Sequence, residues 1–485
     1  MRIYLNNKLC EATLKTDLRF ITNPSINERT TKLADIFGID IDEHEFVIYD
    51  NISIEILPKD IVYITGESGG GKSQLLKIIT DELKKHEEFG NIITDKDVLS
   101  SINNKPIIEQ IGSNVSNAIR ILSIVGLNEA YLMLRRYDEL SDGQKYRFRI
   151  AKMIDSNADT WIMDEFLSML DRTTAKVVAY TIQKAARRFN KTLIVATAHD
   201  DLIEDLNPNL LIVKNFGSDV RIDRREVKNN QCSLVSRVKI VEGSMNDYRQ
   251  LKSLHYKQGK VIPKYIYKAV IDGELAGVIV YGPAHLALKA RNIVLPEYKK
   301  RRDEDGKSHA KKVNDDIVRI WRVIVKPKYR GAGLATKLVK DTLMLVEKPY
   351  VETLAVMAQY SNFFESAGMI KIDPELYNNV DKAYMKALDR LAILGFDSSM
   401  LVSKKYCRER LSILNKEELE EVKRIVIKHF YSEKFKHPRA LKDLLKGDID
   451  ALADALTNRK LPYVYLIWKN PKFIDKPEPK IFLSD

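Results

Sequence analysis

The stretch from Ile61 to Gln74, IVYITGESGGGKSQ, constrains the fold of this chain more than any other part of the sequence. β-branched residues lead into a run of glycines that ends at Lys72 and Ser73, and apolar residues return with helical spacing from Leu75. This order predicts a strand, a glycine-rich loop and a helix. The N–H groups of such a loop and the positive end of the helix dipole both favour a phosphate group. We therefore expect an α/β domain that begins with a phosphate-binding loop.

The spacing of the loop residues indicates a nucleotide bound together with Mg²⁺. Lys72 is placed to reach the β- and γ-phosphates, and the hydroxyl of Ser73 is placed to bind the metal. The residues expected to contact the nucleotide are Gly66, Ser68, Gly69, Gly70, Gly71, Lys72, Ser73 and Gln74.

Length and composition narrow the class of protein. The chain has 485 residues, enough for two or three domains, and its 45% apolar and 30% charged residues are ordinary for a soluble protein. No apolar run approaches the roughly 18 to 20 residues that span a bilayer. The first residues have no secretory signal character. We expect a cytoplasmic protein with no membrane segment.

Charge and cysteine content point to a polyanionic partner in a reducing compartment. Lys and Arg number 79 and Asp and Glu 67, a net charge of +12, which favours nucleic acid as a partner. Cys10, Cys232 and Cys407 lie far apart, without the spacing of a disulfide framework or a zinc site.

Further motifs follow the phosphate loop. The sequence LSDGQ places Ser141 as a helix N-cap and leaves N–H groups near Gly143 open to an anion. An apolar strand then ends in Asp164 and Glu165, where one carboxylate can hold Mg²⁺ and the other can polarise a water molecule. A later strand, TLIVATAHD, ends at His199. Each motif is weak alone, and their order carries the interpretation.

A phosphate loop, a glutamine, LSDGQ, a strand ending in DE, SMLD and a strand ending in histidine are the motif series of ATP-binding-cassette (ABC) ATPases. Residues 46–199 resemble that family. The resemblance implies ATP as the nucleotide, with Gln110 and Asp164 on Mg²⁺. It further implies that Glu165 is the general base and that His199 contacts the γ-phosphate.

The same resemblance implies a homodimer through the ABC domain. Ser141, Gly143 and Gln144 of one subunit would contact the ATP bound by the opposite subunit. The interval from Ser73 to Ser141 is short beside transporter cassettes, and the sequence offers no transmembrane helix. ABC proteins that act on nucleic acid are therefore the nearer comparison.

A second strand, glycine loop and helix unit lies in the later half of the chain. An expected hairpin about Asp272 and Gly273 precedes it. The strand Ile317 to Val325 then runs into RGAGLA, and a helix with apolar periodicity begins near Leu334. This loop lacks the lysine of the first, but its N–H groups and the helix N-terminus suit a pyrophosphate.

The sequence Arg330-x-x-Gly333-x-Ala335 is the R/Q-x-x-G-x-G/A loop of GNAT acyltransferases, and residues 233–372 resemble that family. The resemblance implies acetyl-CoA or another acyl-CoA as a cofactor. Its pyrophosphate would lie on the loop N–H groups and its pantetheine arm along the preceding strand. The residues expected to contact it are Val323, Val325, Arg330, Gly331, Ala332, Gly333, Leu334, Ala335 and Thr336.

One departure from the GNAT pattern concerns the catalytic acid. Many GNAT enzymes have a tyrosine where this chain has Phe364, and phenylalanine cannot donate a proton. Tyr360, one turn earlier, is the candidate replacement, with water or another group as the alternative.

The expected fold class is α/β: an N-terminal ABC-type P-loop ATPase domain, then a GNAT α+β acyltransferase domain with a helical C-terminal part. The expected boundaries are 1–225 for the cassette, 226–375 for the acyl-CoA-binding domain and 376–485 for the helical region. Residues 461–471 are a candidate closing strand of the GNAT sheet, and 297–312 read as an exposed loop.

The whole chain resembles ABC-type ATPases fused to an acetyltransferase domain, and its second half resembles the Mom-type phage acyltransferases that act on adenine in DNA. The leading hypothesis is an ATP-dependent acyltransferase that modifies an amine on nucleic acid, in DNA or tRNA, gated by closure of the ABC dimer. The alternatives are a nucleic-acid-binding clamp with a non-catalytic GNAT module, a protein or small-amine N-acetyltransferase, and the ATPase of a transporter.

Overall fold

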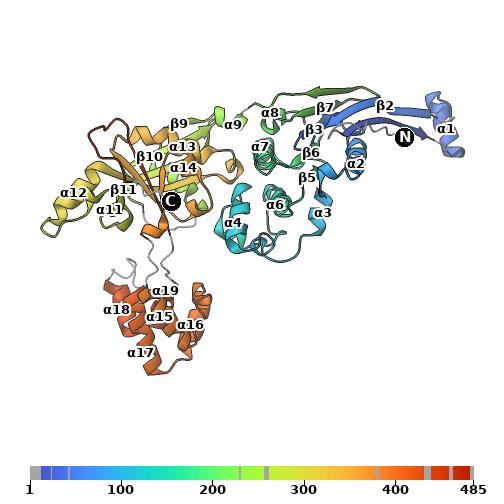
Figure 1. The fold of residues 1–485 in the computed structure, drawn as a ribbon. Helices are drawn as coiled ribbons and strands as arrows, with labels where there is room; N and C mark the ends of the chain where they lie inside the picture. Colours follow the sequence, from blue (N-terminus) through green and yellow to red (C-terminus); the bar gives the residue numbers. More distant parts are fainter. Residues whose placement is uncertain are drawn as a thin grey trace. The chain divides into compact units, whose positions relative to one another are not determined.

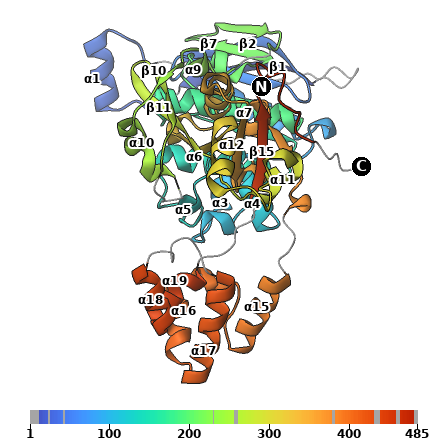
Figure 2. The same ribbon diagram turned by 90° about the vertical axis from the view of Figure 1, so that its left-hand side faces the viewer.

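A computed structural model describes residues 12–22, 25–41, 44–228, 231–255, 261–377, 382–430, 438–457 and 463–480. The chain divides into two compact units, and Figure 1 and Figure 2 draw its helices and strands from two sides. The first unit comprises 1–284, 316–351 and 360–369, and the second comprises 285–315, 352–359 and 370–485. Within the described ranges, no helix combines the length and the apolar character needed to cross a membrane.

A parallel sheet carries the first glycine loop. Among the described residues its strand order is β4-β5-β6-β3-β7-β8, and β8 runs antiparallel to β7. The strands β3, β5, β6 and β7 are buried along most of their length, because helices cover both faces of the sheet, whereas β4 at the edge is half-buried. The strand bounds are β3 (Ile61–Gly66), β4 (Ile92–Thr94), β5 (Thr160–Met163), β6 (Thr192–Ala196), β7 (Leu210–Lys214) and β8 (Val220–Arg224).

Alternate residues of the central strand enter two different cores. Ile61 and Tyr63 lie in a cluster with residues of α4, α6 and α7, whereas Val62 and Ile64 lie in a cluster with residues of α2. The carboxyl ends of the parallel strands consequently share one edge, where ligands of open α/β sheets bind. The helices are α2 (Lys72–Leu83), α3 (Asp95–Ser100), α4 (Val115–Ile124), α5 (Ala130–Met133), α6 (Asp142–Asp155), α7 (Arg172–Arg188) and α8 (Ile203–Leu206).

A separate two-stranded sheet precedes the loop. β1 (Ala12–Thr22) pairs antiparallel with β2 (His44–Ile56). The helix α1 (Glu28–Phe37) lies between them in sequence and begins at an Asn27 cap. Tyr49 of β2 is fully buried, and its hydroxyl donates to the carbonyl oxygen of Gly71 in the glycine loop.

A second sheet is formed by later strands, in the order β14-β15-β13-β12-β11-β10-β9 within the described residues. β9 to β12 form an antiparallel meander, and β14 pairs antiparallel with β15. The strand expected at 461–471 is β15. The bounds are β9 (Lys239–Glu242), β10 (Tyr265–Ile271), β11 (Glu274–Pro283), β12 (Ile317–Val325), β13 (Tyr350–Ala355), β14 (Ile370–Ile372) and β15 (Val464–Lys469).

Short helices accompany this sheet. The hairpin expected at Asp272 and Gly273 is present, and both residues have the positive φ angles (50° and 82°) that a two-residue turn needs. The glycine loop after β12 leads into α13. The helices are α9 (Ser233–Ser236), α10 (Met245–Leu251), α11 (Lys289–Val294), α13 (Leu334–Leu343) and α14 (Phe363–Ser366).

The loop expected at 297–312 is wrong over its second half. The helix α12 (Gly306–Asp316) begins there, and His309 and Val313, four residues apart, are both buried. The Nε2 atom of His309 lies 3.0 Å from the carbonyl oxygen of Tyr298. A histidine that fills an apolar position hides the helical period from the sequence, which explains the error.

The C-terminal helices of the second unit enclose a hydrophobic core of their own. Gly447, with a φ of 79°, separates two of these helices, and Asp448 caps the second one. The helices are α15 (Lys382–Ile393), α16 (Lys404–Ser412), α17 (Lys416–Ile425), α18 (Pro438–Lys446) and α19 (Ile449–Leu456).

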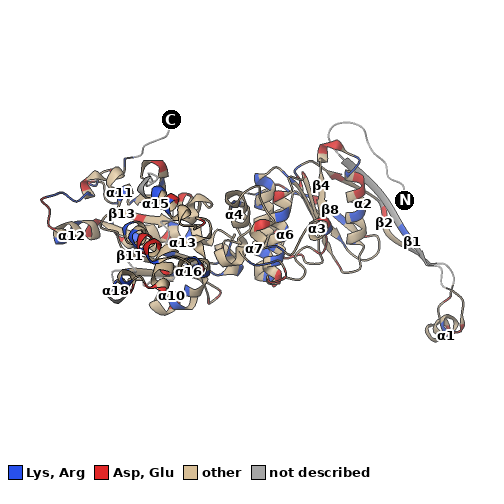
Figure 3. Ribbon diagram, turned by 90° about the horizontal axis from the view of Figure 1, so that it is seen from below, with Lys and Arg blue, Asp and Glu red and all other residues tan. Residues whose placement is uncertain are grey.

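Basic and acidic residues both occur on these helices and are coloured blue and red in Figure 3. Lys404 of α16 lies 2.5 Å from Asp454, and Arg408 of the same helix pairs with Asp450. The charges of these two basic residues of α16 are therefore partly neutralised by acidic residues of α19.

Candidate nucleotide site and second glycine loop

The phosphate loop connects β3 to α2 and contains two positions that only glycine can occupy. Gly66 has a φ of 125°, and a Cβ atom on it would lie 2.0 Å from the carbonyl oxygen of Lys214. Gly71 is the N-cap of α2 with a φ of 97°, and its Cβ would lie 2.6 Å from the side chain of Ile48. The loop is thus shaped by the backbone of β7 and by β2 before any ligand binds.

The amine of Lys72 is turned into the loop. It donates to the carbonyl oxygens of Gly66 (2.9 Å) and Glu67 (2.5 Å). Burial lowers the pKa of Lys72, and the carboxylates of Asp164 and Glu67 oppose that shift. In the structure the amine donates to carbonyl oxygens. A bound triphosphate would offer it charged acceptors in their place.

Ser73 and Asp164 come together as the sequence predicts. The Ser73 hydroxyl donates to Oδ1 of Asp164 over 3.1 Å, and the backbone N–H of Glu165 donates to the same oxygen over 2.9 Å. A hydroxyl and a carboxylate are hard oxygen ligands, and Mg²⁺ binds through one or two carboxylates plus phosphate and water. The two residues present therefore fit Mg²⁺ bound with a nucleotide.

Glu165 follows β5 in a tight turn. It is exposed, its φ is 46°, and two residues later Leu167 has a φ of 58°. Phe166 between them is buried, and its N–H donates to the carbonyl oxygen of Ala196 on β6 over 2.8 Å. The turn holds the carboxylate outward at the ligand edge of the sheet.

Gln110 does not meet the other predicted Mg²⁺ ligands through any contact among the described residues. Its side-chain amide donates to the carbonyl oxygens of Asn103 (3.0 Å) and Lys105 (2.5 Å), and its oxygen accepts from the N–H of Asn103 (3.0 Å). Because the side chain is buried, its polar atoms need partners, and its own loop supplies them. A role on Mg²⁺ requires this loop to open.

The residues of the LSDGQ motif lie at the start of α6, which we call the signature helix. Ser141 is the exposed N-cap, and its N–H donates to Oε1 of Gln144 over 3.0 Å. A Cβ on Gly143 would come within 3.3 Å of Thr174. Ser141 remains accessible to another molecule, whereas the amide oxygen of Gln144 serves the helix cap.

His199 lies three residues beyond the end of β6, which is shorter than the sequence predicts. Its backbone carbonyl accepts hydrogen bonds from the hydroxyls of Tyr63 and Thr65, the latter over 2.7 Å. The side chain is half-buried at the edge of the sheet that carries Asp164.

Sequence reasoning missed residues that shape this site. Tyr49 is buried and donates to the carbonyl oxygen of Gly71 over 3.1 Å. Asp95 directly follows β4, the neighbour of β5, and burial raises its pKa, with the Asp164 carboxylate contributing. The signal for Asp95 was the same as for Asp164, an acidic residue after an apolar strand.

The second glycine loop lies between β12 and α13. Gly331 has a φ of 96°, and Gly333, the N-cap of α13, has a φ of 92° with nothing within 4 Å of its Cβ position. Ala332 and Leu334 are buried, while Ala335 and Thr336 are partly exposed. The space beside Gly333, at the N-terminus of α13, is therefore not filled by another part of the chain, and no side chain caps this helix.

Arg330 is engaged by protein groups of the same unit. Its guanidinium forms an ion pair with Glu129 and donates to the carbonyl oxygen of Val325 over 2.9 Å. Arg147, a buried residue of α6, donates to the carbonyl oxygen of Arg330 over 2.8 Å. Burial lowers the pKa of Arg147 to about 10. Arg330 thus shapes the loop, and its predicted contact with acyl-CoA requires release from Glu129.

The residues expected around the acyl group are only partly assembled. Val323 and Val325 pair with Ile279 and Gly277 of β11, so their backbone groups belong to the sheet. Tyr360 is half-buried just before α14. Phe364 is buried, and its ring centroid lies 4.1 Å from that of Phe363.

Comparisons with known proteins agree with the geometry of the first loop. The ABC transporter family matches residues 49–168. Protein p29 of Mesomycoplasma hyorhinis, a probable ABC transporter ATP-binding protein, is 25% identical over 225 residues, 38% of this chain and 88% of that protein. The cell division ATP-binding protein FtsE of Bacillus subtilis is 28% identical over 197 residues, 34% of this chain and 85% of that protein.

A solved structure of the dimeric ATP-binding cassette MJ0796 in a post-hydrolysis state, bound to ADP and Pi, is 20% identical with a TM-score of 0.30. It covers 43% of this chain and 98% of that one. From the family match and the loop geometry, the N-terminal part of this chain is an ABC ATPase domain with an α/β fold.

Proposed function

We propose that this protein is an ATP-gated acyltransferase that transfers an acyl group from acyl-CoA to an amine on a nucleic acid, most directly adenine in DNA or a base in tRNA. The observation that carries the proposal is the second strand, glycine loop and helix unit. There the N-terminus of α13 opens beside Gly333 with no side chain filling the space. Such an N-terminus suits the pyrophosphate of acetyl-CoA or another acyl-CoA.

The loop is braced in a way that suits a fixed phosphate site. Glu274 of β11 accepts from Lys326 (2.9 Å), Lys328 (2.5 Å) and the hydroxyl of Tyr329 (3.1 Å), the residues that lead from β12 into the loop. The entry to the loop is therefore held against the neighbouring strand. This arrangement supports a role for Arg330 to Thr336 as a cradle for acyl-CoA.

The proposed chemistry is amide formation. A neutral amine attacks the thioester carbonyl carbon, the C–S bond breaks, the amine loses a proton and the departing thiolate gains one. Tyr360 is the proposed acid for the thiolate, since Phe364 has no proton to give.

The proposed role of the ABC domain is to gate access to the nucleic acid. In a homodimer, the exposed Ser141 and the backbone at Gly143 would contact ATP held by Lys72 and Ser73 of the other subunit. Hydrolysis, with Asp164 on Mg²⁺ and Glu165 as general base, would open the dimer again. The net charge of +12 supports a nucleic-acid partner.

The test uses purified full-length protein with radiolabelled acetyl-CoA, DNA or tRNA, and ATP. Label is expected in the nucleic acid with wild type, and not with Gly333→Glu, whose carboxylate would repel a pyrophosphate. Lys72→Ala is expected to abolish the ATP-dependent part of the signal. Transfer to protein or to a small amine, with none to nucleic acid, would overturn the proposed acceptor.

One observation favours a second candidate, a nucleic-acid-binding ABC clamp in which the later sheet binds acyl-CoA without turnover. Phe364 is buried against Phe363 at the position expected for an acid. Under this alternative, calorimetry would detect acetyl-CoA binding that Gly333→Glu removes, while no acceptor becomes labelled.

A further inference from the structure

The turn that carries Glu165 adopts a backbone that is unusual for its residues. Glu165 and Leu167 both have positive φ angles, 46° and 58°, and neither is glycine. Such conformations are strained for residues other than glycine and persist only where neighbouring groups hold them. The position of the Glu165 carboxylate therefore depends on whatever fixes Leu167.

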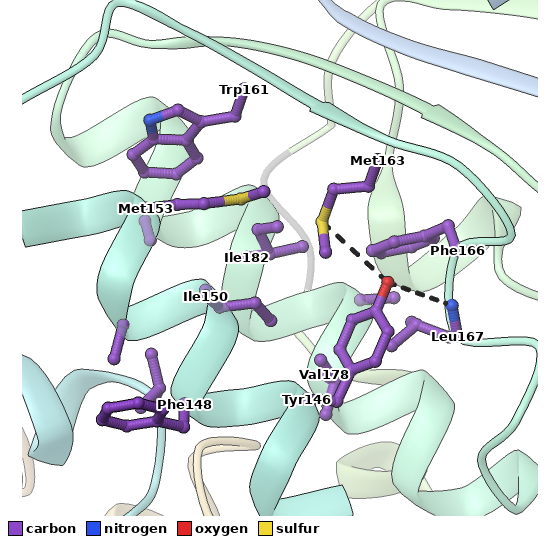
Figure 4. Packing of buried hydrophobic residues seen from close by; sticks show 14 of the residues in the cluster. Tyr146, Phe148, Ile150, Met153, Trp161, Met163, Phe166, Leu167, Val178 and Ile182 are labelled. Atoms are coloured by element: carbon purple, nitrogen blue, oxygen red, sulfur yellow. Dashed lines mark hydrogen bonds between the residues drawn. The ribbon is translucent and has the colours of Figure 1, made fainter. Parts of the chain in front are cut away.

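Tyr146 of α6 is the side chain that meets this turn (Figure 4). Its hydroxyl oxygen accepts a hydrogen bond from the N–H of Leu167 over 3.3 Å, and its O–H donates to the sulfur of Met163 over 4.0 Å. Its ring meets that of Phe166 edge to face, with centroids 6.2 Å apart. Tyr146 thus contacts the last residue of β5 and two residues of the turn.

Tyr146 also belongs to the signature helix. It lies five residues after Ser141 and is buried, and burial raises the pKa of its hydroxyl, so the group stays protonated at neutral pH. Because α6 is one continuous helix from Asp142, a displacement at Ser141 moves Tyr146 as well. The element expected to touch the partner's nucleotide is therefore bonded to the turn of the subunit's own Glu165.

We propose that Tyr146 is a positioning residue for ATP hydrolysis, which holds the Glu165 turn in its strained form and ties the place of that carboxylate to the position of the signature helix. The proposal rests on the role of Glu165 as general base. It makes no use of the acyltransferase assignment, so ATP hydrolysis alone can test it.

The first test compares Tyr146→Phe with wild type in steady-state ATP hydrolysis. The variant keeps the ring and leaves the Leu167 N–H without its partner, so kcat is expected to fall by about five- to tenfold while KM for ATP stays within about twofold. Tyr137→Phe is the control. Its ring packs on Phe148 of the same helix, and no side-chain hydrogen bond to the Glu165 turn is lost with its hydroxyl. Its kcat is expected to match wild type.

The second test separates positioning from general stability. If Tyr146 acts through Glu165, adding Tyr146→Phe to Glu165→Gln should not lower the residual hydrolysis further. A further fivefold loss in the double variant, or an unchanged kcat in Tyr146→Phe alone, would overturn the proposal. Full activity of Glu165→Gln would instead refute the role of the base itself.

A second variant guards against misfolding of the first. Phe166→Leu removes the edge-to-face contact and keeps the hydroxyl of Tyr146, and it is expected to lower kcat by about two- to threefold with KM unchanged. Melting temperatures are recorded for all variants. A Phe166→Leu protein that melts lower yet keeps the wild-type kcat would show that this cluster serves stability only.

Discussion

At the scale of single residues, two glycines of the phosphate loop are present for different reasons. Gly66 and Gly69 both have positive φ angles, 125° and 80°. Only Gly66 also faces backbone, since its Cβ would lie 2.0 Å from the carbonyl oxygen of Lys214. Gly69 has nothing within 4 Å. An alanine would therefore have a strained backbone at either position. Only at Gly66 would its methyl group also clash with the backbone of β7.

We predict that Gly69→Ala lowers the free energy of unfolding by about 1–2 kcal/mol, the cost of the backbone conformation alone. Gly66→Ala is predicted to cost more than about 4 kcal/mol, because a strand backbone must also move. Urea denaturation of both proteins measures the difference. Equal losses would show that the contact between β3 and β7 is not tight.

Tyr360 makes a second prediction at this scale. If its hydroxyl protonates the departing thiolate, Tyr360→Phe should lower kcat for acyl transfer by about 10²-fold with KM for acetyl-CoA unchanged. Rates are measured by release of free thiol in the presence of nucleic acid. Phe364→Tyr is the companion variant, and recovery of activity in Tyr360→Phe/Phe364→Tyr would show that either position can supply the proton. An unaltered kcat in Tyr360→Phe would leave water as the proton source.

At the scale of elements, β11 and β12 are joined by charge as well as by the sheet ladder. Hydrogen bonds from Lys326 and Lys328, with a smaller contribution from Tyr329, lower the pKa of Glu274 to about 2. A carboxyl group whose pKa is lower in the folded chain stabilises it most above the unfolded pKa, and the contribution disappears as pH falls through the folded value.

We therefore predict that wild type loses stability relative to Glu274→Gln between about pH 5 and pH 2. Above pH 5 the wild type is the more stable protein, and the gap closes on acidification. Chemical denaturation across this range checks the sign. Glu375→Gln, at an exposed position, is the control and should show no such convergence. A gap that widens towards low pH would contradict the bond network around Glu274.

Many of these elements follow from local patterns, and the exceptions have identifiable causes. The strand and helix around the first loop follow from apolar spacing, and the hairpin follows from Asp272 and Gly273, whose positive φ angles a two-residue turn requires. The sequence does not predict α12, because a polar residue occupies one of its buried positions. His309 is buried there, with its ring against a carbonyl group.

The candidate site divides in the same way. Ser73 and Asp164 were predictable, because a loop and a strand end share the ligand edge of a parallel sheet. The position of the Gln110 side chain, turned into its own loop, was not predictable. It depends on hydrogen bonds to Asn103 and Lys105 that no local pattern specifies. Tyr146 was equally hidden, since its partner Leu167 lies 21 residues away and meets it only through tertiary packing.

At the scale of the whole molecule, one chain carries an ABC ATPase domain and a second sheet with its own glycine loop. The first loop has the lysine and metal ligands of a triphosphate site, and the second has an open helix N-terminus without them. We propose that the two loops bind two phosphate-bearing ligands of different chemistry.

The homodimer is tested by light scattering. Glu165→Gln with ATP is predicted to have twice the monomer mass of 55.7 kDa, because bound ATP is not hydrolysed and bridges two subunits. Adding Ser141→Arg should return the mass to that of a monomer without loss of ATP binding. Ser236→Arg, at an exposed serine outside the motif, is the control. A monomer in every sample would exclude nucleotide-dependent dimerisation.

Acylation of nucleic acid in cells is measured by the intact mass of nucleosides from DNA and tRNA of cells that express wild type, Lys72→Ala, Glu165→Gln or Gly333→Glu. We expect an acylated nucleoside with wild type that is absent from all three variants. An acylated nucleoside that persists in Gly333→Glu, or none in any sample while purified protein acylates another amine, would contradict this expectation.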